Sequence, residues 1–89
     1  MSAPKVVMYG ADWCGYCARA RALLDAKGVA YEEIDTDVVP GARQEARTRS
    51  GKGTIPQIFI GDQHVGGSDE LAALEADGRL DSLLKNTEP

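Results

Sequence analysis

Two cysteines three positions apart are the residues of this sequence best suited to chemistry. Cys14 and Cys17 enclose Gly15 and Tyr16, and no other cysteine occurs among the 89 residues. On a helix, positions i and i+3 are neighbours. A disulfide between the two side chains can therefore form and break with little movement of the backbone. A bond that closes so small a loop cannot staple a fold, so the pair predicts thiol–disulfide chemistry.

The two thiols are expected to play different roles. Cys14 lies where a loop enters a predicted helix. The unpaired N–H groups of a helix N-terminus favour the anionic thiolate, which is the nucleophile. Cys17 lies one turn inside the helix and is expected to be the more buried of the two. The spacing therefore predicts that Cys14 attacks a substrate disulfide and that Cys17 resolves the product.

Two other interpretations of the pair stay open. The cysteines can be inert buried thiols that pack like small apolar side chains. They can also join His64 and a carboxylate around a zinc ion, although no second CxxC or histidine pair completes the usual ligand spacing. A dithiol beside a β-α-β pattern in a chain without a signal peptide favours redox chemistry over both.

Length and composition limit the classes of protein to which the chain can belong. We expect a single domain over residues 1–89 with an ordered core at about residues 5–85, since 43% hydrophobic and 27% charged residues are typical of a folded protein. A net charge of −4 excludes the basic footprint of a nucleic-acid or anionic-membrane binder. No apolar run approaches the roughly 20 residues of a membrane span or resembles a signal peptide. These features predict a cytoplasmic protein.

Hydrophobic periodicity and turn residues predict eight elements in the order β-α-β-α-β-β-α-α. Ser68 is expected to cap the third helix and Gly78 to stop it, and residues 86–89 are expected to form a loose tail. The first β-α-β unit should be parallel and right-handed, and the hairpin at Gly61 should add two antiparallel strands. The result is an α/β fold with a four-stranded mixed sheet and helices on both faces. The predicted elements span residues 5–9, 14–27, 29–34, 40–49, 57–60, 63–65, 68–77 and 80–84.

Four motifs in this order resemble the glutaredoxin family, which has the thioredoxin fold, and its short bacterial-type dithiol members above all. They are Tyr9 with the Cys14–Cys17 pair, residues 54–57, residues 66–69 and the leucine-rich C-terminal helices. The resemblance covers residues 5 to about 85. It implies a glutathione-dependent oxidoreductase that reduces protein–glutathione mixed disulfides and protein disulfides through Cys14 and Cys17. Its partners would be glutathione, as co-substrate, and the oxidised proteins, and it would act as a monomer.

The resemblance also implies a glutathione site. The Ile55–Pro56 bond would be cis and would present the Ile55 backbone to the cysteinyl part of glutathione. The helix N-terminus at Ser68 and Asp69 would bind the γ-glutamyl end. Pro56 also has an ordinary structural explanation as a strand-start proline, and Ser68 as a helix cap. The further contacts implied by the resemblance are Tyr16, Thr54, Gly67, Arg49 and Lys52. Arg49 and Lys52 can equally be solvated surface charges.

Two departures from the family pattern lie near Cys14, and the second of them keeps another function open. Ala11 stands where many relatives have lysine, and Gly15 stands where many dithiol relatives have proline. Some relatives without that proline hold a [2Fe–2S] cluster between two subunits. The second hypothesis is therefore a glutathione-ligated cluster carrier, a dimer in which Cys14 of each subunit is the iron ligand. A third is a thioredoxin-like reductase served by a flavoenzyme.

Overall fold

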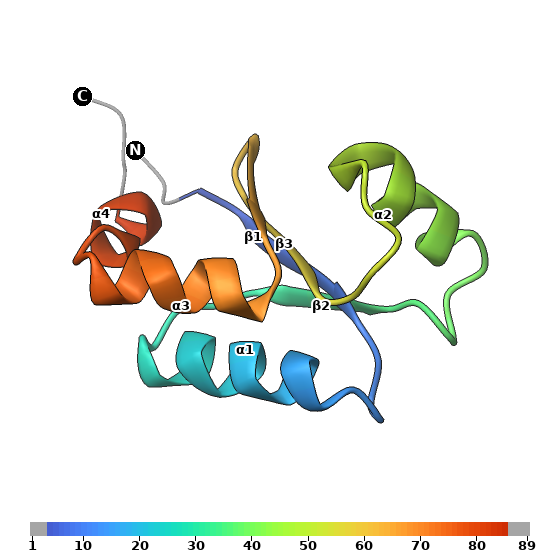
Figure 1. The fold of residues 1–89 in the computed structure, drawn as a ribbon, viewed down its shortest axis with the longest axis horizontal. Helices are drawn as coiled ribbons and strands as arrows, with labels where there is room; N and C mark the ends of the chain where they lie inside the picture. The colour runs from blue at the N-terminus through green and yellow to red at the C-terminus, as the bar shows by residue number, and fades with distance from the viewer. Residues whose placement is uncertain (1–3, 86–89) are drawn as a thin grey trace.

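The chain alternates strands and helices in the predicted order. The structure is a computed structural model that describes residues 4–85 (Figure 1). The predicted loose tail at residues 86–89 lies outside the described residues. The elements are β1 (Val6–Gly10), α1 (Gly15–Ala26), β2 (Glu32–Asp35), α2 (Ala42–Ser50), β3 (Gln57–Ile60), β4 (Gln63–Gly66), α3 (Ser68–Ala76) and α4 (Leu80–Leu84).

The four strands form one mixed sheet in the order β2-β1-β3-β4. β1 pairs in parallel with β2 and antiparallel with β3, and β3 pairs antiparallel with β4. The predicted fold is thus confirmed. Successive side chains of β1 enter opposite cores, with Val6 and Met8 on one face and Val7 and Tyr9 on the other. Because both faces are covered, β1 is a continuous apolar run instead of an alternating one.

Helices cover both faces of the sheet. α1 and α3 lie side by side on one face and α2 lies on the other (Figure 1). Ala46 of α2 packs against Val7, Tyr9 and Phe59 in the smaller core. No helix within residues 4–85 has the length and apolar character to cross a membrane. The larger core, under α1 and α3, consists of Val6, Met8, Ala20, Leu24, Ile58, Ile60, Leu71, Leu80 and Leu84.

Two predicted starts of elements are wrong by two or three residues. β2 begins at Glu32 and not at Val29. Val29 and Tyr31 pack against the larger core from the connection that follows α1, so their apolar character reflects core packing and not strand pairing. α2 begins at Ala42 instead of residue 40, because Gly41 precedes it with a left-handed φ of 80°.

The predicted cap of α3 is also displaced by one residue. Gly67 occupies the N-cap position, and Ser68 is the first helical residue and is buried. The side chain of Glu70 accepts a hydrogen bond from the Gly67 N–H at 2.7 Å. This bond satisfies the backbone donor just before the helix. Ser68 is therefore buried without being the cap of α3, and it instead lines the groove of the candidate site.

The larger core predicts that truncation of two adjacent leucines of α1 lowers the free energy of unfolding by different amounts. Leu24 is fully buried, whereas Leu23 is only partly buried against the same core. We expect Leu24→Ala to lower the free energy of unfolding by about 2–5 kcal/mol, because it leaves a cavity under the helix. Leu23→Ala is the matched control and should cost clearly less. Urea denaturation of both variants measures this, and equal losses would contradict the packing described.

Candidate active site

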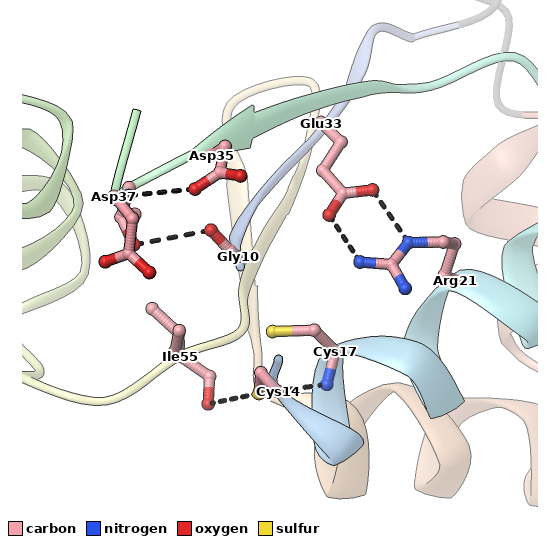
Figure 2. Close-up of polar contacts among 9 residues, drawn as sticks. Gly10, Cys14, Cys17, Arg21, Glu33, Asp35, Asp37 and Ile55 are labelled. Atoms are coloured by element: carbon pink, nitrogen blue, oxygen red, sulfur yellow. Dashed lines mark hydrogen bonds and ion pairs between the residues drawn. The ribbon is translucent and has the colours of Figure 1, made fainter. Parts of the chain in front are cut away.

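Cys14 occupies the N-cap position of α1. Its backbone is extended, with φ −85° and ψ 116°, and its sulfur accepts a hydrogen bond from the Cys17 N–H at 3.2 Å. Cys14 Sγ also lies 3.9 Å from the carbonyl oxygen of Ile55, which belongs to the segment that precedes β3 (Figure 2). A sulfur that caps a helix faces the positive end of the helix dipole. The Cys14 sulfur is thus the side-chain cap of α1.

Cys17 lies one turn inside α1 and is fully buried, whereas Cys14 at the N-cap retains 6% exposure. The expected asymmetry is therefore present, and both thiols are free. Burial, followed by a hydrogen bond with Cys14, raises the pKa of Cys17 to about 12. Because this pKa lies far above neutrality, Cys17 is held as the protonated thiol while Cys14 caps the helix.

Gly10 makes room for the buried sulfur. It ends β1 directly beneath α1, and a Cβ added there would lie 2.9 Å from Cys17 Sγ. The Gly10 carbonyl accepts hydrogen bonds from the N–H and the hydroxyl of Thr36, at 2.8 and 3.3 Å. These bonds fix the end of β1 to the loop that follows β2. A side chain at position 10 would therefore meet the Cys17 side chain while its own backbone is held in place.

A groove of about 530 Å³ runs from Tyr16 to the N-terminus of α3. Ile55 both lines this groove and packs against Cys14 and Cys17, so the dithiol lies next to the groove. The Ile55–Pro56 bond is cis, as the resemblance implies. Eight residues of the predicted glutathione site line the groove, namely Tyr16, Lys52, Thr54, Ile55, Pro56, Gly67, Ser68 and Asp69.

Arg49, the ninth residue of that predicted set, is directed elsewhere. Its Nη1 donates a hydrogen bond to Tyr9 Oη at 2.9 Å, and its guanidinium lies 4.1 Å from the Phe59 ring centroid. Tyr9 Oη in turn donates to Glu45 at 3.1 Å. These contacts fasten α2 to the sheet. Arg49 thus contributes to packing on the face opposite α1, and Lys52 is the cation of this segment that lines the groove.

A chain of polar side chains that the sequence did not reveal supports one wall of the groove. Gln57 is buried and donates to the carbonyl and the hydroxyl of Thr54, at 2.9 and 3.2 Å. Its Oε1 lies 2.7 Å from His64 Nε2, which identifies that nitrogen as the donor. His64 therefore has a partner inside the groove wall. The only available signal was the position of Gln57 directly after Pro56.

Exposed aromatic side chains flank the dithiol. Trp13 is 68% exposed and Tyr16 is 57% exposed. The Trp13 indole N–H donates a hydrogen bond to Asp37, in the loop after β2. Ala11 is buried against both cysteines, so no cation occupies this position. Two exposed aromatic side chains therefore lie beside the cysteine pair in the chain.

The fold and the site together define a thioredoxin-fold protein with a dithiol at the N-terminus of its first helix. The glutaredoxin family model matches residues 6–65. A glutaredoxin of Pseudomonas aeruginosa is 52% identical over 81 residues, which cover 91% of this chain and 96% of the relative. The chain belongs to the glutaredoxin family, whose members are in general thiol–disulfide oxidoreductases.

Solved structures agree with this assignment. The crystal structure of a buckwheat glutaredoxin–glutathione complex has a TM-score of 0.87 at 30% identity, over 93% of this chain and 78% of the other. The solution structure of a glutaredoxin from Brucella melitensis has a TM-score of 0.85 at 52% identity, over 100% of this chain and 97% of the other.

The room left by Gly10 can be tested with two glycine substitutions. Gly10→Ala would place a methyl group 2.9 Å from Cys17 Sγ, so we expect overpacking to cost about 1–3 kcal/mol of unfolding free energy. Gly15→Ala is the control, because an added Cβ there meets no atom within 4 Å. Urea denaturation of the reduced proteins measures both. A Gly10→Ala variant as stable as Gly15→Ala would refute the tight contact.

Proposed function

We propose that this protein is a glutathione-dependent thiol–disulfide oxidoreductase that reduces protein–glutathione mixed disulfides and protein disulfides. One observation carries the proposal: Ile55, whose carbonyl oxygen lies 3.9 Å from the helix-capping sulfur of Cys14, lines a groove that extends to the N-terminus of α3. Such a groove offers a nucleophile to a disulfide and backbone N–H groups to a carboxylate. The similarity to a buckwheat glutaredoxin that was solved with glutathione supports glutathione as the thiol co-substrate.

The monothiol reaction needs Cys14 alone. Its thiolate attacks the glutathione sulfur of a protein–glutathione mixed disulfide, forms a disulfide between Cys14 and glutathione, and releases the protein thiolate, which takes a proton from water. The thiolate of a second glutathione then attacks the bound glutathione sulfur. This step releases oxidised glutathione and restores the Cys14 thiolate. The Cys17 N–H at 3.2 Å stabilises the Cys14 sulfur whenever it carries the charge.

The dithiol reaction also needs Cys17. Cys14 first attacks a protein disulfide, which releases one protein thiolate and leaves the other sulfur bonded to Cys14. Cys17 loses its proton and attacks Cys14 Sγ, so a Cys14–Cys17 disulfide forms and the second protein thiolate departs. Two glutathione molecules then reduce this disulfide and leave as oxidised glutathione. A reducing compartment such as the cytoplasm would supply them.

Glutathione binding follows from the polar groups along the groove. The α-carboxylate of its γ-glutamyl end would accept hydrogen bonds from the N–H groups of Ser68 and Asp69 at the start of α3. The Asp69 carboxylate would bind the neighbouring ammonium. The Ile55 backbone would pair with the cysteinyl unit, and Lys52 would bind the glycine carboxylate. Tyr16 and Thr54 would form the walls beside the sulfur.

The cluster-carrier hypothesis stays a prediction. A [2Fe–2S] cluster takes four ligands, and within residues 4–85 no three His, Cys, Asp or Glu side chains converge as a metal site. Ligands from a second chain and from glutathione would have to complete the set. The contacts described here favour thiol exchange, since Cys14 and Cys17 serve it without a partner chain.

Replacing each cysteine separates the two reactions. We expect Cys14→Ser to lose reduction of a glutathionylated peptide and of a protein disulfide, because the nucleophile is gone. Cys17→Ser should retain the first reaction and lose the second, because only the resolving step needs Cys17. Glutathione-coupled assays with both substrates measure this. Full activity of Cys14→Ser would show that the assignment is wrong.

The proposed binding of glutathione predicts a specific role for Asp69. Asp69→Asn removes the charge that would bind the ammonium group, so we expect KM for glutathione to rise by about fivefold to tenfold. Asp62→Asn is the matched control, because Asp62 lies exposed in the β3–β4 turn and outside the groove. Equal KM values for the two variants would remove Asp69 from the site.

A further inference from the structure

The dithiol route depends on a thiol that the structure holds in its protonated form. Cys17 is fully buried, and burial raises its pKa far above neutrality. Only the thiolate attacks a disulfide at a useful rate. The charged groups that face Cys17 must therefore influence the resolving step. Within residues 4–85, Arg21 of α1 acts on Cys17 through its charge, and Glu33 of β2 binds Arg21 and lies across the Gly10 position from the Cys17 sulfur.

Arg21 and Glu33 form a two-pronged ion pair next to Cys17. Arg21 follows Cys17 by four positions and so shares its face of α1. Its Nε donates to Glu33 Oε1 at 2.8 Å and its Nη2 to Oε2 at 2.6 Å (Figure 2). The side chains are only 29% and 23% exposed. Partial burial weakens solvent screening, so these charges act on neighbouring groups more strongly than surface charges do.

The empty side-chain position of Gly10 brings this ion pair close to the thiol. Glu33 pairs with Met8 across the sheet, so its side chain points to the same face as those of Met8 and position 10. A Cβ at Gly10 would lie 2.9 Å from Cys17 Sγ and 3.5 Å from Glu33 Oε2. The thiol and the carboxylate thus flank the same vacant position, with no side chain from β1 between them.

We propose that the Arg21–Glu33 ion pair controls how fast Cys17 resolves a disulfide on Cys14, with Arg21 promoting and Glu33 restraining formation of the Cys17 thiolate. The inference rests on the dithiol route of the proposed function. Arg21 lowers the pKa of Cys17 through its charge, against the larger effect of burial. Glu33 neutralises that charge through two hydrogen bonds. Both are positioning residues, because neither touches the substrate.

The chemical step itself is balanced without any further reactant. Cys17 gives its proton to solvent, and Cys17 Sγ bonds to Cys14 Sγ. The bond between Cys14 Sγ and the substrate sulfur breaks, and the substrate departs as a thiolate that takes up a proton. The ion pair changes the population of the Cys17 thiolate before this exchange, so a change in its net charge should change the rate in a predictable direction.

Matched glutamine substitutions test the proposal. Cys14 is first converted to a mixed disulfide with thionitrobenzoate, and stopped-flow absorbance follows the release of that dye when Cys17 attacks. We expect Glu33→Gln to speed release and Arg21→Gln to slow it, each by about tenfold, the change in thiolate fraction that one pKa unit gives. The double variant, which restores neutrality, should return to within about twofold of the unsubstituted protein.

Two further measurements separate an electrostatic role from a structural one. Arg21→Lys keeps the charge and should keep most of the rate, and in a Cys14→Ser background the alkylation rate of Cys17 should follow the same order among the variants. If both single glutamine variants shift the rate in the same direction, or neither shifts it, the proposal is overturned. Urea denaturation confirms that each variant is folded.

The dye assay contains no glutathione and no protein substrate. The predicted order of rates in a protein that fails to use glutathione would therefore refute the proposed function and leave this inference standing. The reverse result, glutathione-dependent activity without the predicted order, would refute the inference alone.

Discussion

The hydrogen bond from the Cys17 N–H to the Cys14 sulfur links the fold to the chemistry. It exists because Cys14 caps α1 while Cys17 lies one turn inside the same helix. The first sulfur thereby caps the helix, and the second is fully buried and kept protonated, because burial raises its pKa. Two identical side chains thus acquire different roles from a difference of three positions.

This arrangement places demands on the rest of the molecule. α1 must lie closely on the sheet, and the two-sided burial of β1 between the cores holds its end in place. Gly10 must lack a side chain, since any Cβ would strike Cys17 Sγ. The segment before β3 must bring Ile55 to Cys14, from which the groove continues to α3. The sheet, the glycine and the groove all serve the geometry of the same sulfur.

Much of this could be predicted from the sequence, because local patterns carry it. The order of the elements, the mixed sheet, the helix starting at the cysteine pair and the residues around Pro56 and Ser68 follow from periodicity and family motifs. The missed features depend on contacts between distant positions. Val29 is apolar because it packs against the core, not because it pairs in β2. Arg49 has the charge of a ligand-binding residue, but its stacking on Phe59 required the arrangement of α2 over the sheet.

The Arg21–Glu33 pair shows the same limit most clearly. Its residues are twelve positions apart, and each alone is an unremarkable surface charge in the sequence. Only the parallel pairing of β1 with β2 directs Glu33 to the face under α1. The influence of the pair on Cys17 therefore could not be inferred before the register of the sheet was known.

The difference between the two thiols can be measured directly on the reduced protein. It is treated briefly at neutral pH with less than one equivalent of iodoacetamide, and the modified cysteine is identified by peptide mass spectrometry. We expect the label on Cys14, because its sulfur retains some exposure, whereas Cys17 is a fully buried thiol whose pKa is raised by burial. Equal labelling of the two cysteines, or preferential labelling of Cys17, would contradict it.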